Sequence, residues 1–188
     1  MIVSVASIAE ILDLPPGTAP SRDDERRAAG ILAERMLSGL GAHFSRDEKL
    51  LPVWPEGFSG SISHCRGEAA AAVRRGAPLG IDLEEIGRVS GKLFYRIAAQ
   101  EEIAAYDALK QDSDACGEFF RTAVFSAKEA FWKLVRNSGG GSPAWREIVT
   151  EIPVGGSRLT VRGAGMTASG EIRSVSGKKI LVILEEKR

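Results

Sequence analysis

The helical periodicity of residues 119–135, FFRTAVFSAKEAFWKLV, is the strongest constraint on the fold. Apolar residues recur in this segment at positions 120, 124, 127, 131 and 134. Spacings of three and four residues keep these side chains on one face of an α-helix. Such a helix draws most of its stability from packing that face against other elements. We therefore expect a long helix on a core, and this helix also carries Lys128, Glu129 and Lys133.

Shorter periodic segments predict the other elements. Residues 24–40 and 93–109 have helical spacing, with Ser21 or Asp23 as the N-cap of the first helix and a break at residues 112–118. An opening strand or short helix precedes them. Strands are expected in four places, with hairpin connections between them: residues 61–64, 69–73 and 79–86, and the tail from Ile148 onward. This mixture predicts an α+β protein with short antiparallel strands.

Charge and cysteine content exclude several classes of function. Lys plus Arg and Asp plus Glu each number 25, so no broad basic surface indicates a nucleic-acid partner, and an anion site must be local. No apolar run approaches a membrane span, and the first residues lack the basic start of a signal peptide, which predicts a cytoplasmic protein without a membrane partner. Cys65 and Cys116 have no metal-ligand spacing, and we expect two reduced thiols rather than a disulfide.

The stretch GIDLE places two carboxylates on one strand face. Alternation along a strand directs Asp82 and Glu84 to one side, and Ile81 and Leu83 to the other. An ordinary half-solvated edge strand has the same pattern. The functional alternative is a site for a hard divalent cation such as Mg²⁺, with Glu129 as a third oxygen ligand. Without a cation, three such carboxylates would repel one another.

Two further stretches have both an ordinary and a functional interpretation. In SISHC, Ser63 and His64 are able to donate hydrogen bonds to a phosphate, although a single histidine is more often structural. In FSAKEAFWK, Glu129 and Lys133 stand one helical turn apart. As an exposed pair they would stabilise the helix by only about 0.2–0.5 kcal/mol.

Three stretches occurring in order, WPEGFSGSISHC, LGIDLE and FSAKEAFWK, closely resemble the 4′-phosphopantetheinyl transferases. The similarity is to the monomeric group that activates enterobactin and surfactin synthetases. It implies two similar α+β halves related by a pseudo-twofold axis, with coenzyme A in the cleft between them. The halves would comprise residues 1–78, with the coenzyme-binding loop and helix, and residues 79–188, with the metal-binding carboxylates and the catalytic helix.

The resemblance also implies roles for individual residues. Asp82, Glu84 and Glu129 match the metal ligands of the family, Glu129 matches its favoured base, and Lys133 matches a catalytic lysine that reaches the phosphates. The residues that match coenzyme-binding positions are Arg26, Arg27, Lys49, Ser63, His64, Lys128 and Lys133. Either Arg26 or Arg27 would contact the nucleotide end of the coenzyme.

The implied activity is an Mg²⁺-dependent transfer, with Mn²⁺ as a possible substitute. The 4′-phosphopantetheine arm of coenzyme A would pass to a serine of an apo acyl or peptidyl carrier protein, and 3′,5′-ADP would be released. The sequence leaves open whether the carrier serves siderophore, nonribosomal peptide, polyketide or fatty-acid synthesis. Two alternatives remain: a non-catalytic module that binds coenzyme A or a nucleotide, and a structural partner of a synthetase.

Overall fold

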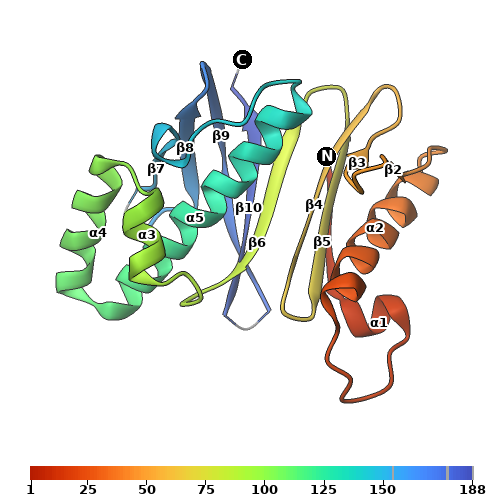
Figure 1. Cartoon of the computed structure of the whole chain (residues 1–188), viewed down its shortest axis with the longest axis horizontal. Helices are drawn as coiled ribbons and strands as arrows, with labels where there is room; N and C mark the ends of the chain where they lie inside the picture. Colours follow the sequence, from red (N-terminus) through yellow and green to blue (C-terminus); the bar gives the residue numbers. More distant parts are fainter. Residues whose placement is uncertain (154, 177, 188) are drawn as a thin grey trace.

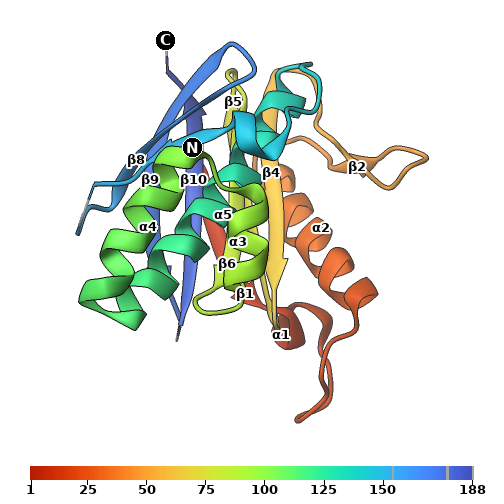
Figure 2. The same cartoon turned by 60° about the vertical axis from the view of Figure 1, so that its left-hand side comes forward.

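Two antiparallel β-sheets form the centre of the protein in the computed structural model, which describes residues 1–153, 155–176 and 178–187. The smaller sheet has the order β1-β5-β4 and the larger one the order β6-β10-β9-β8-β7. The strands of the smaller sheet are β1 Ile2–Ser7, β4 Phe58–Cys65 and β5 Glu68–Arg75. Those of the larger sheet are β6 Leu79–Glu85, β7 Val149–Glu151, β8 Arg158–Gly163, β9 Met166–Val175 and β10 Lys179–Glu186. A two-stranded hairpin, β2 Ser45–Arg46 with β3 Pro52–Val53, extends away from the body beside α2 (Figure 2).

Helices cover the outer faces of both sheets (Figure 1). The helices are α1 Ile8–Leu12, α2 Arg22–Ser38, α3 Gly91–Ile97, α4 Gln100–Asp112 and α5 Asp114–Asn137, with a 3₁₀ turn η1 at Trp145–Glu147. The first two pack on the smaller sheet and α5 packs on the larger one. The smaller sheet therefore lies between helices on its outer side and strands β6 and β10 of the larger sheet on its inner side.

The alanine-rich strand β5 shows how the two sheets come together. Ala69 and Ala71 face α1 and α2, whereas Ala70 and Ala72 face β6 and β10 of the larger sheet. All four are fully buried. Small side chains are suited to this strand because it is covered on both faces by closely packed neighbours.

Strands β4 and β6 are joined through side chains. The Oγ atom of Ser61 accepts a hydrogen bond from the backbone N–H of Ile81 at 3.0 Å, and that of Ser63 accepts from Leu83 at 3.1 Å. These N–H groups lie on the edge strand of the larger sheet and are buried, so they require acceptors. Alternate residues of β4 therefore supply the acceptors that a neighbouring backbone would supply within a sheet.

The α+β class is confirmed, and most of the expected elements are present with shifted ends. Ser21 is the N-cap of α2, accepting from the N–H of Asp24, whose carboxylate accepts in turn from the N–H of Ser21. The predicted strands 61–64 and 69–73 form longer strands that pair with each other as a hairpin. The expected hairpin between 69–73 and 79–86 is wrong, because β5 and β6 belong to different sheets.

Two helix predictions need correction. The single helix expected over residues 93–109 is divided into α3 and α4, because Ala98 and Ala99 are extended and Glu102 caps the second helix by accepting from the N–H of Ala99. The break expected at residues 112–118 is also mostly helical, since α5 begins at Asp114.

Three further expectations concern the whole chain. The division near residue 78 and the pseudo-twofold relation of the halves stay predictions. Both cysteines are free thiols, with Cys65 buried and Cys116 exposed. Among the helices of the described ranges, none combines the length and the apolar character needed to cross a membrane.

Candidate active site

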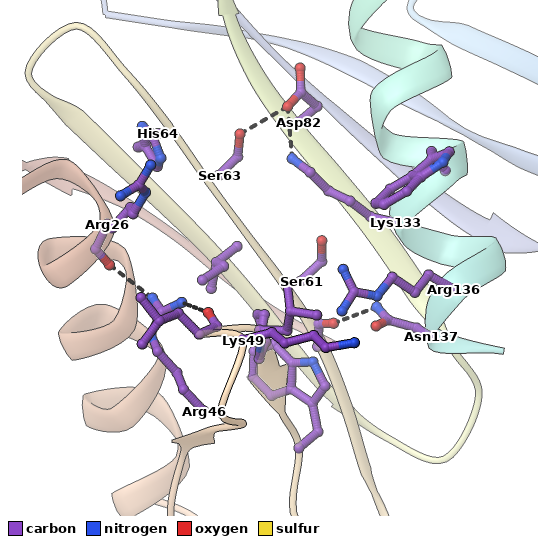
Figure 3. Close-up of a pocket in the computed structure, with 17 residues that line it drawn as sticks. Arg26, Arg46, Lys49, Ser61, Ser63, His64, Asp82, Lys133, Arg136 and Asn137 are labelled. Atoms are coloured by element: carbon purple, nitrogen blue, oxygen red, sulfur yellow. Dashed lines mark hydrogen bonds and ion pairs between the residues drawn. The ribbon is translucent and has the colours of Figure 1, made fainter. Parts of the chain in front are cut away.

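A cavity of about 600 Å³ lies between α2, β4, β6, α5 and the β2–β3 hairpin (Figure 3). Its size is within the range of small-molecule sites. Five of its lining side chains are cationic: Arg26, Arg46, Lys49, Lys133 and Arg136. Asp82 is the carboxylate among the lining residues that the structure describes. This wall matches a ligand with several negative charges, although the chain as a whole is formally neutral.

Asp82 is held by donors from two elements. Its Oδ1 atom accepts from the Oγ of Ser63 at 2.9 Å and from the Nζ of Lys133 at 2.8 Å. Its Oδ2 atom accepts from the Oγ of Ser126 at 3.0 Å. Figure 3 shows the side chains of Ser63 and Lys133 converging on this carboxylate. Only 6% of Asp82 is exposed, and these bonds supply the partners that a buried carboxylate requires.

A glycine in β6 lets α5 come close enough to reach Asp82. A Cβ placed on Gly80 would lie 1.9 Å from the carbonyl oxygen of Ala130, so any side chain at residue 80 would force the helix away. Residues 126, 129 and 133 of α5 are three and four positions apart and share one helix face. This face is thereby brought against the strand that carries Asp82.

Glu129 is the carboxylate with the least compensation. It is half-buried and accepts no hydrogen bond from the described part of the chain. Burial raises the pKa of this carboxyl, the charges of Asp82 and Glu84 raise it further, and Lys133 opposes the shift. A carboxyl whose pKa is raised toward neutral pH is a stronger proton acceptor than an ordinary surface glutamate.

Glu84 has partners of its own, two residues further along the same face of β6. Its Oε1 lies 3.0 Å from an Nη of Arg88 and 3.3 Å from the Sγ of Cys65. Burial, followed by the charge of Glu84, raises the pKa of the Cys65 thiol to about 11. The thiol is therefore protonated at neutral pH, and it acts here as a weak donor to Glu84 rather than as a nucleophile.

The three predicted metal ligands fit Mg²⁺ in the chemistry of their donors. They are carboxylates, and burial followed by the charges of Asp82 and Glu84 raises the pKa of Glu129. In the described ranges, however, no three His, Cys, Asp or Glu side chains are arranged as a ready metal cage. Lys133 and Arg88 contact two of the carboxylates instead. A metal would have to displace these contacts, so the assignment of Asp82, Glu84 and Glu129 as ligands stays a prediction.

His64 lines the cavity and pairs with α2. Its Nδ1 lies 3.0 Å from a carboxylate oxygen of Glu25. Burial lowers the pKa of His64, and the charges of Lys133 and Arg26 lower it further, while Glu25 opposes the change. The predicted donor is therefore at the cavity, next to two of its cations.

Of the other predicted coenzyme contacts, some lie at the cavity and some do not. Arg26 and Lys49 line the cavity, Lys49 from the loop between β2 and β3. Arg27 is exposed on α2 and is absent from the described lining, so the structure favours Arg26 over Arg27.

The structure places Lys128 away from the cavity, so its geometry does not favour the predicted contact with coenzyme A, which stays a prediction. Lys128 is fully buried, and its Nζ lies 2.8 Å from Glu102 of α4. The Nζ also donates to the backbone oxygens of Ile97, Trp145 and Ile148. With four acceptors and no exposed surface, this ammonium has no access to a phosphate in the cavity. Its contacts hold α5 against α3, α4 and the segment before β7.

The sequence analysis missed several residues that line the cavity or that contact Asp82 beside it. Ser126 lies inside the quoted helix stretch, and Arg136 and Asn137 follow Lys133 by three and four residues, which places them on the same face. Asn137 donates to the backbone oxygens of Gly60 in β4 and Leu79 in β6. No local signal in the sequence indicated Arg46, which reaches the carbonyl oxygens of Arg26 and Leu50 from the β2–β3 hairpin.

Comparisons with known proteins match both parts of the chain. Residues 16–74 match a family model described as the 4′-phosphopantetheinyl transferase N-terminal domain, and residues 78–176 match that of the 4′-phosphopantetheinyl transferase superfamily.

Curated relatives include enterobactin synthase component D of two bacteria. The Escherichia coli (strain K12) protein is 41% identical over 87 residues, which is 44% of this chain and 38% of the relative. The Salmonella typhimurium (strain LT2) protein is 39% identical over 114 residues, or 60% of this chain and 47% of the relative. The matched part of the chain thus spans less than half the length of these relatives. Because the superfamily match covers 99 of its 188 residues, the chain belongs to the 4′-phosphopantetheinyl transferase superfamily.

Proposed function

We propose that this protein transfers the 4′-phosphopantetheine arm of coenzyme A to a serine of an apo carrier protein. The serine oxygen forms a bond to the β-phosphorus of coenzyme A, the bond from that phosphorus to the bridging oxygen breaks, and 3′,5′-ADP leaves. Membership of the superfamily supports the reaction class. The proposal includes a single chain acting in the cytoplasm, with a siderophore, nonribosomal peptide, polyketide or fatty-acid carrier as acceptor.

The observation that carries the proposal is the cationic cavity with Asp82 in its wall. Coenzyme A has a diphosphate and a 3′-phosphate, and its charge requires several cations for binding in a confined site. We assign Arg26, Lys49, Ser63 and His64 to the coenzyme, and add Arg46 and Arg136 because their side chains line the same space. Phosphoryl transfer depends mainly on positioning and on neutralising charge, and this wall is suited to both.

We further propose that Asp82, Glu84 and Glu129 hold Mg²⁺, or Mn²⁺ in its place. The metal would neutralise charge on the diphosphate. Lys133 has a double role in this proposal. Without ligands its ammonium compensates Asp82, at 2.8 Å, and with coenzyme bound it is available to a phosphate oxygen. The positive charge of Lys133 is paired in both states, because the ammonium leaves the carboxylate of Asp82 for an anionic phosphate oxygen.

Glu129 is the proposed acceptor of the serine proton, directly or through a water. Its half-buried carboxyl has a raised pKa and no hydrogen-bond donor in the described chain, so its oxygens are available to an incoming hydroxyl. Burial, then Asp82 and Glu84, make the charged form less stable, which favours uptake of a proton during the reaction.

Intact-mass analysis of several apo carriers with coenzyme A and Mg²⁺ tests the proposal. An accepted carrier should gain the mass of one phosphopantetheine with the full chain, and not with Asp82→Asn. Glu151→Gln is the matched control, since Glu151 is an exposed residue that pairs with Arg162 on the larger sheet. Transfer that persists in excess EDTA would overturn the metal assignment. Binding of coenzyme A without transfer to any carrier would support the non-catalytic module, and absence of binding the structural partner.

A further inference from the structure

Ser126 lies in the middle of α5 with no exposed surface, and it contacts Asp82. Its Oγ is 3.0 Å from Oδ2 and 3.2 Å from the backbone oxygen of Asp82. These are the hydrogen bonds of this hydroxyl among the described residues. Ser126 does not line the cavity in the described chain, so any effect that it has on a bound ligand must pass through Asp82.

The direction of this hydroxyl differs from that of two other hydroxyls, one on α5 and one at its C-cap. Thr122 donates to the carbonyl oxygen of Glu118 at 2.8 Å, and Ser138 donates to that of Leu134 at 3.0 Å. Both bonds go back four residues within the chain, which is the usual local partner of a hydroxyl in a helix. Ser126 instead donates across the interface to a carboxylate on β6.

A purely steric explanation for a small residue at this position is available. The approach between α5 and β6 is close at Gly80, and α5 has alanines at 123, 127 and 130 along its buried side. Alanine at residue 126 would satisfy the same packing, with higher helix propensity and without a buried polar group. Packing therefore explains the size of Ser126 but not its hydroxyl.

The two oxygens of Asp82 also differ in their donors. Oδ1 accepts from Ser63 and Lys133, both of which line the cavity and would meet a ligand there. Oδ2 accepts from Ser126, which stays behind the carboxylate. When a ligand draws Lys133 away, the hydroxyl of Ser126 remains to fix the rotation of the carboxylate group.

We propose that Ser126 is a positioning residue, which holds the Asp82 carboxylate in the orientation needed for the metal and the coenzyme diphosphate. This inference rests on the proposed function. Removing a hydrogen-bond partner of a metal-binding carboxylate typically weakens metal affinity by about 10- to 100-fold. The fold depends little on the bond, since Asp82 keeps two other donors.

The test compares Ser126→Ala with Ser138→Ala, which removes a hydroxyl from the end of the same helix without contact to Asp82. Mn²⁺ affinity is measured by electron paramagnetic resonance with coenzyme A present, together with kcat, the KM for coenzyme A and the Mg²⁺ concentration for half-maximal transfer. Ser126→Ala should bind Mn²⁺ about 10- to 100-fold more weakly and need more Mg²⁺. Its KM for coenzyme A should change less than its kcat. The metal-free melting temperature should match that of Ser138→Ala.

The proposal would be overturned if Ser126→Ala and the unsubstituted protein had the same Mn²⁺ affinity and the same Mg²⁺ dependence of transfer. Ser126→Cys, which keeps a weak donor on a slightly larger side chain, should give intermediate affinity, and it replaces Ser126→Ala if that variant does not fold. The Mn²⁺ measurement does not require transfer. If the unmodified chain binds Mn²⁺ but modifies no carrier, the proposed function fails while Ser126 is still judged by the affinity difference. If it binds no Mn²⁺, the metal assignment and the role of Ser126 both fail.

Discussion

Lys133 Nζ lies 2.8 Å from Oδ1 of Asp82 and 3.0 Å from the backbone oxygen of Ile81, so a cation occupies the position next to the proposed metal-binding carboxylate. Arg88 compensates Glu84 in the same way. The mutual repulsion expected of three carboxylates is therefore relieved at two of them. Glu129 has no hydrogen-bond donor in the described chain, and its pKa is raised, first by burial. The unfavourable free energy of charging the three carboxylates without a ligand therefore falls mainly on Glu129.

Glu129→Gln should leave the metal-free protein as stable as before or make it more stable. A carboxyl whose pKa is raised in the folded state destabilises the fold at pH values above that pKa, because folding then requires an unfavourable charge. Removing the charge removes that penalty, while transfer should fall by orders of magnitude because the base and a metal ligand are lost. Thermal melting in EDTA and the transfer rate measure both effects, with Glu151→Gln as the control. If the variant melts at a lower temperature and transfers at the parental rate, Glu129 and Lys133 form only a stabilising ion pair on the helix and have no role in transfer.

Lys128→Met should destabilise the fold by about 3–5 kcal/mol, because it leaves Glu102 charged and buried without its partner. The coenzyme A affinity of the folded protein should remain unchanged, since Lys128 is remote from the cavity surface. Lys133→Met is the informative comparison on the same helix, and it should weaken coenzyme binding. Urea denaturation and calorimetry separate the two variants. If Lys128→Met were stable and bound coenzyme A poorly, a phosphate contact would have to be restored to this lysine.

Ser61→Ala should cost about 1–3 kcal/mol of unfolding free energy, because the buried N–H of Ile81 loses its acceptor. Ser59 is a buried serine on the same strand, and its side chain makes no hydrogen bond with the described residues. Ser59→Ala should therefore cost less. Equal denaturation midpoints for the two variants would show that the side-chain bonds between β4 and β6 contribute nothing to stability.

The stability of the protein should fall as the pH is lowered from about 7.5 to 5.5, in part because of His64. Burial places the pKa of His64 below its ordinary value of 6.5 in the folded state, so the unfolded chain binds the proton more readily. Between the lowered pKa and 6.5, the unfolding free energy therefore rises with pH and decreases on acidification. His64→Gln should reduce this pH dependence. His43→Gln, at the only other histidine, controls for the loss of an exposed ring. Parallel pH profiles for the full chain and His64→Gln would contradict the assignment.

The periodicity and spacing of the sequence determined the elements on which the site is built. The apolar stripe of 119–135 specified an amphipathic helix, Ser21 or Asp23 indicated a helix start, and alternation in GIDLE placed Asp82 and Glu84 on one side of a strand. These features are local, since they depend on residues within one or two turns or on neighbouring strand positions. The spacing of Glu129 and Lys133 also placed these two side chains one helical turn apart before any partner was known.

Only the tertiary structure decided which face of each element meets the cavity. Lys128 and Lys133 are five residues apart, which separates them by about 140° around the helix axis, so they cannot both reach the same ligand. The sequence contains this angle but not the identity of the partners. Lys128 forms a buried ion pair with Glu102, which precedes it by 26 positions. Lys133 forms an ion pair with Asp82, which precedes it by 51 positions. Contacts at such separations arise from the packing of whole elements on a common core, and no pattern within a single segment specifies them.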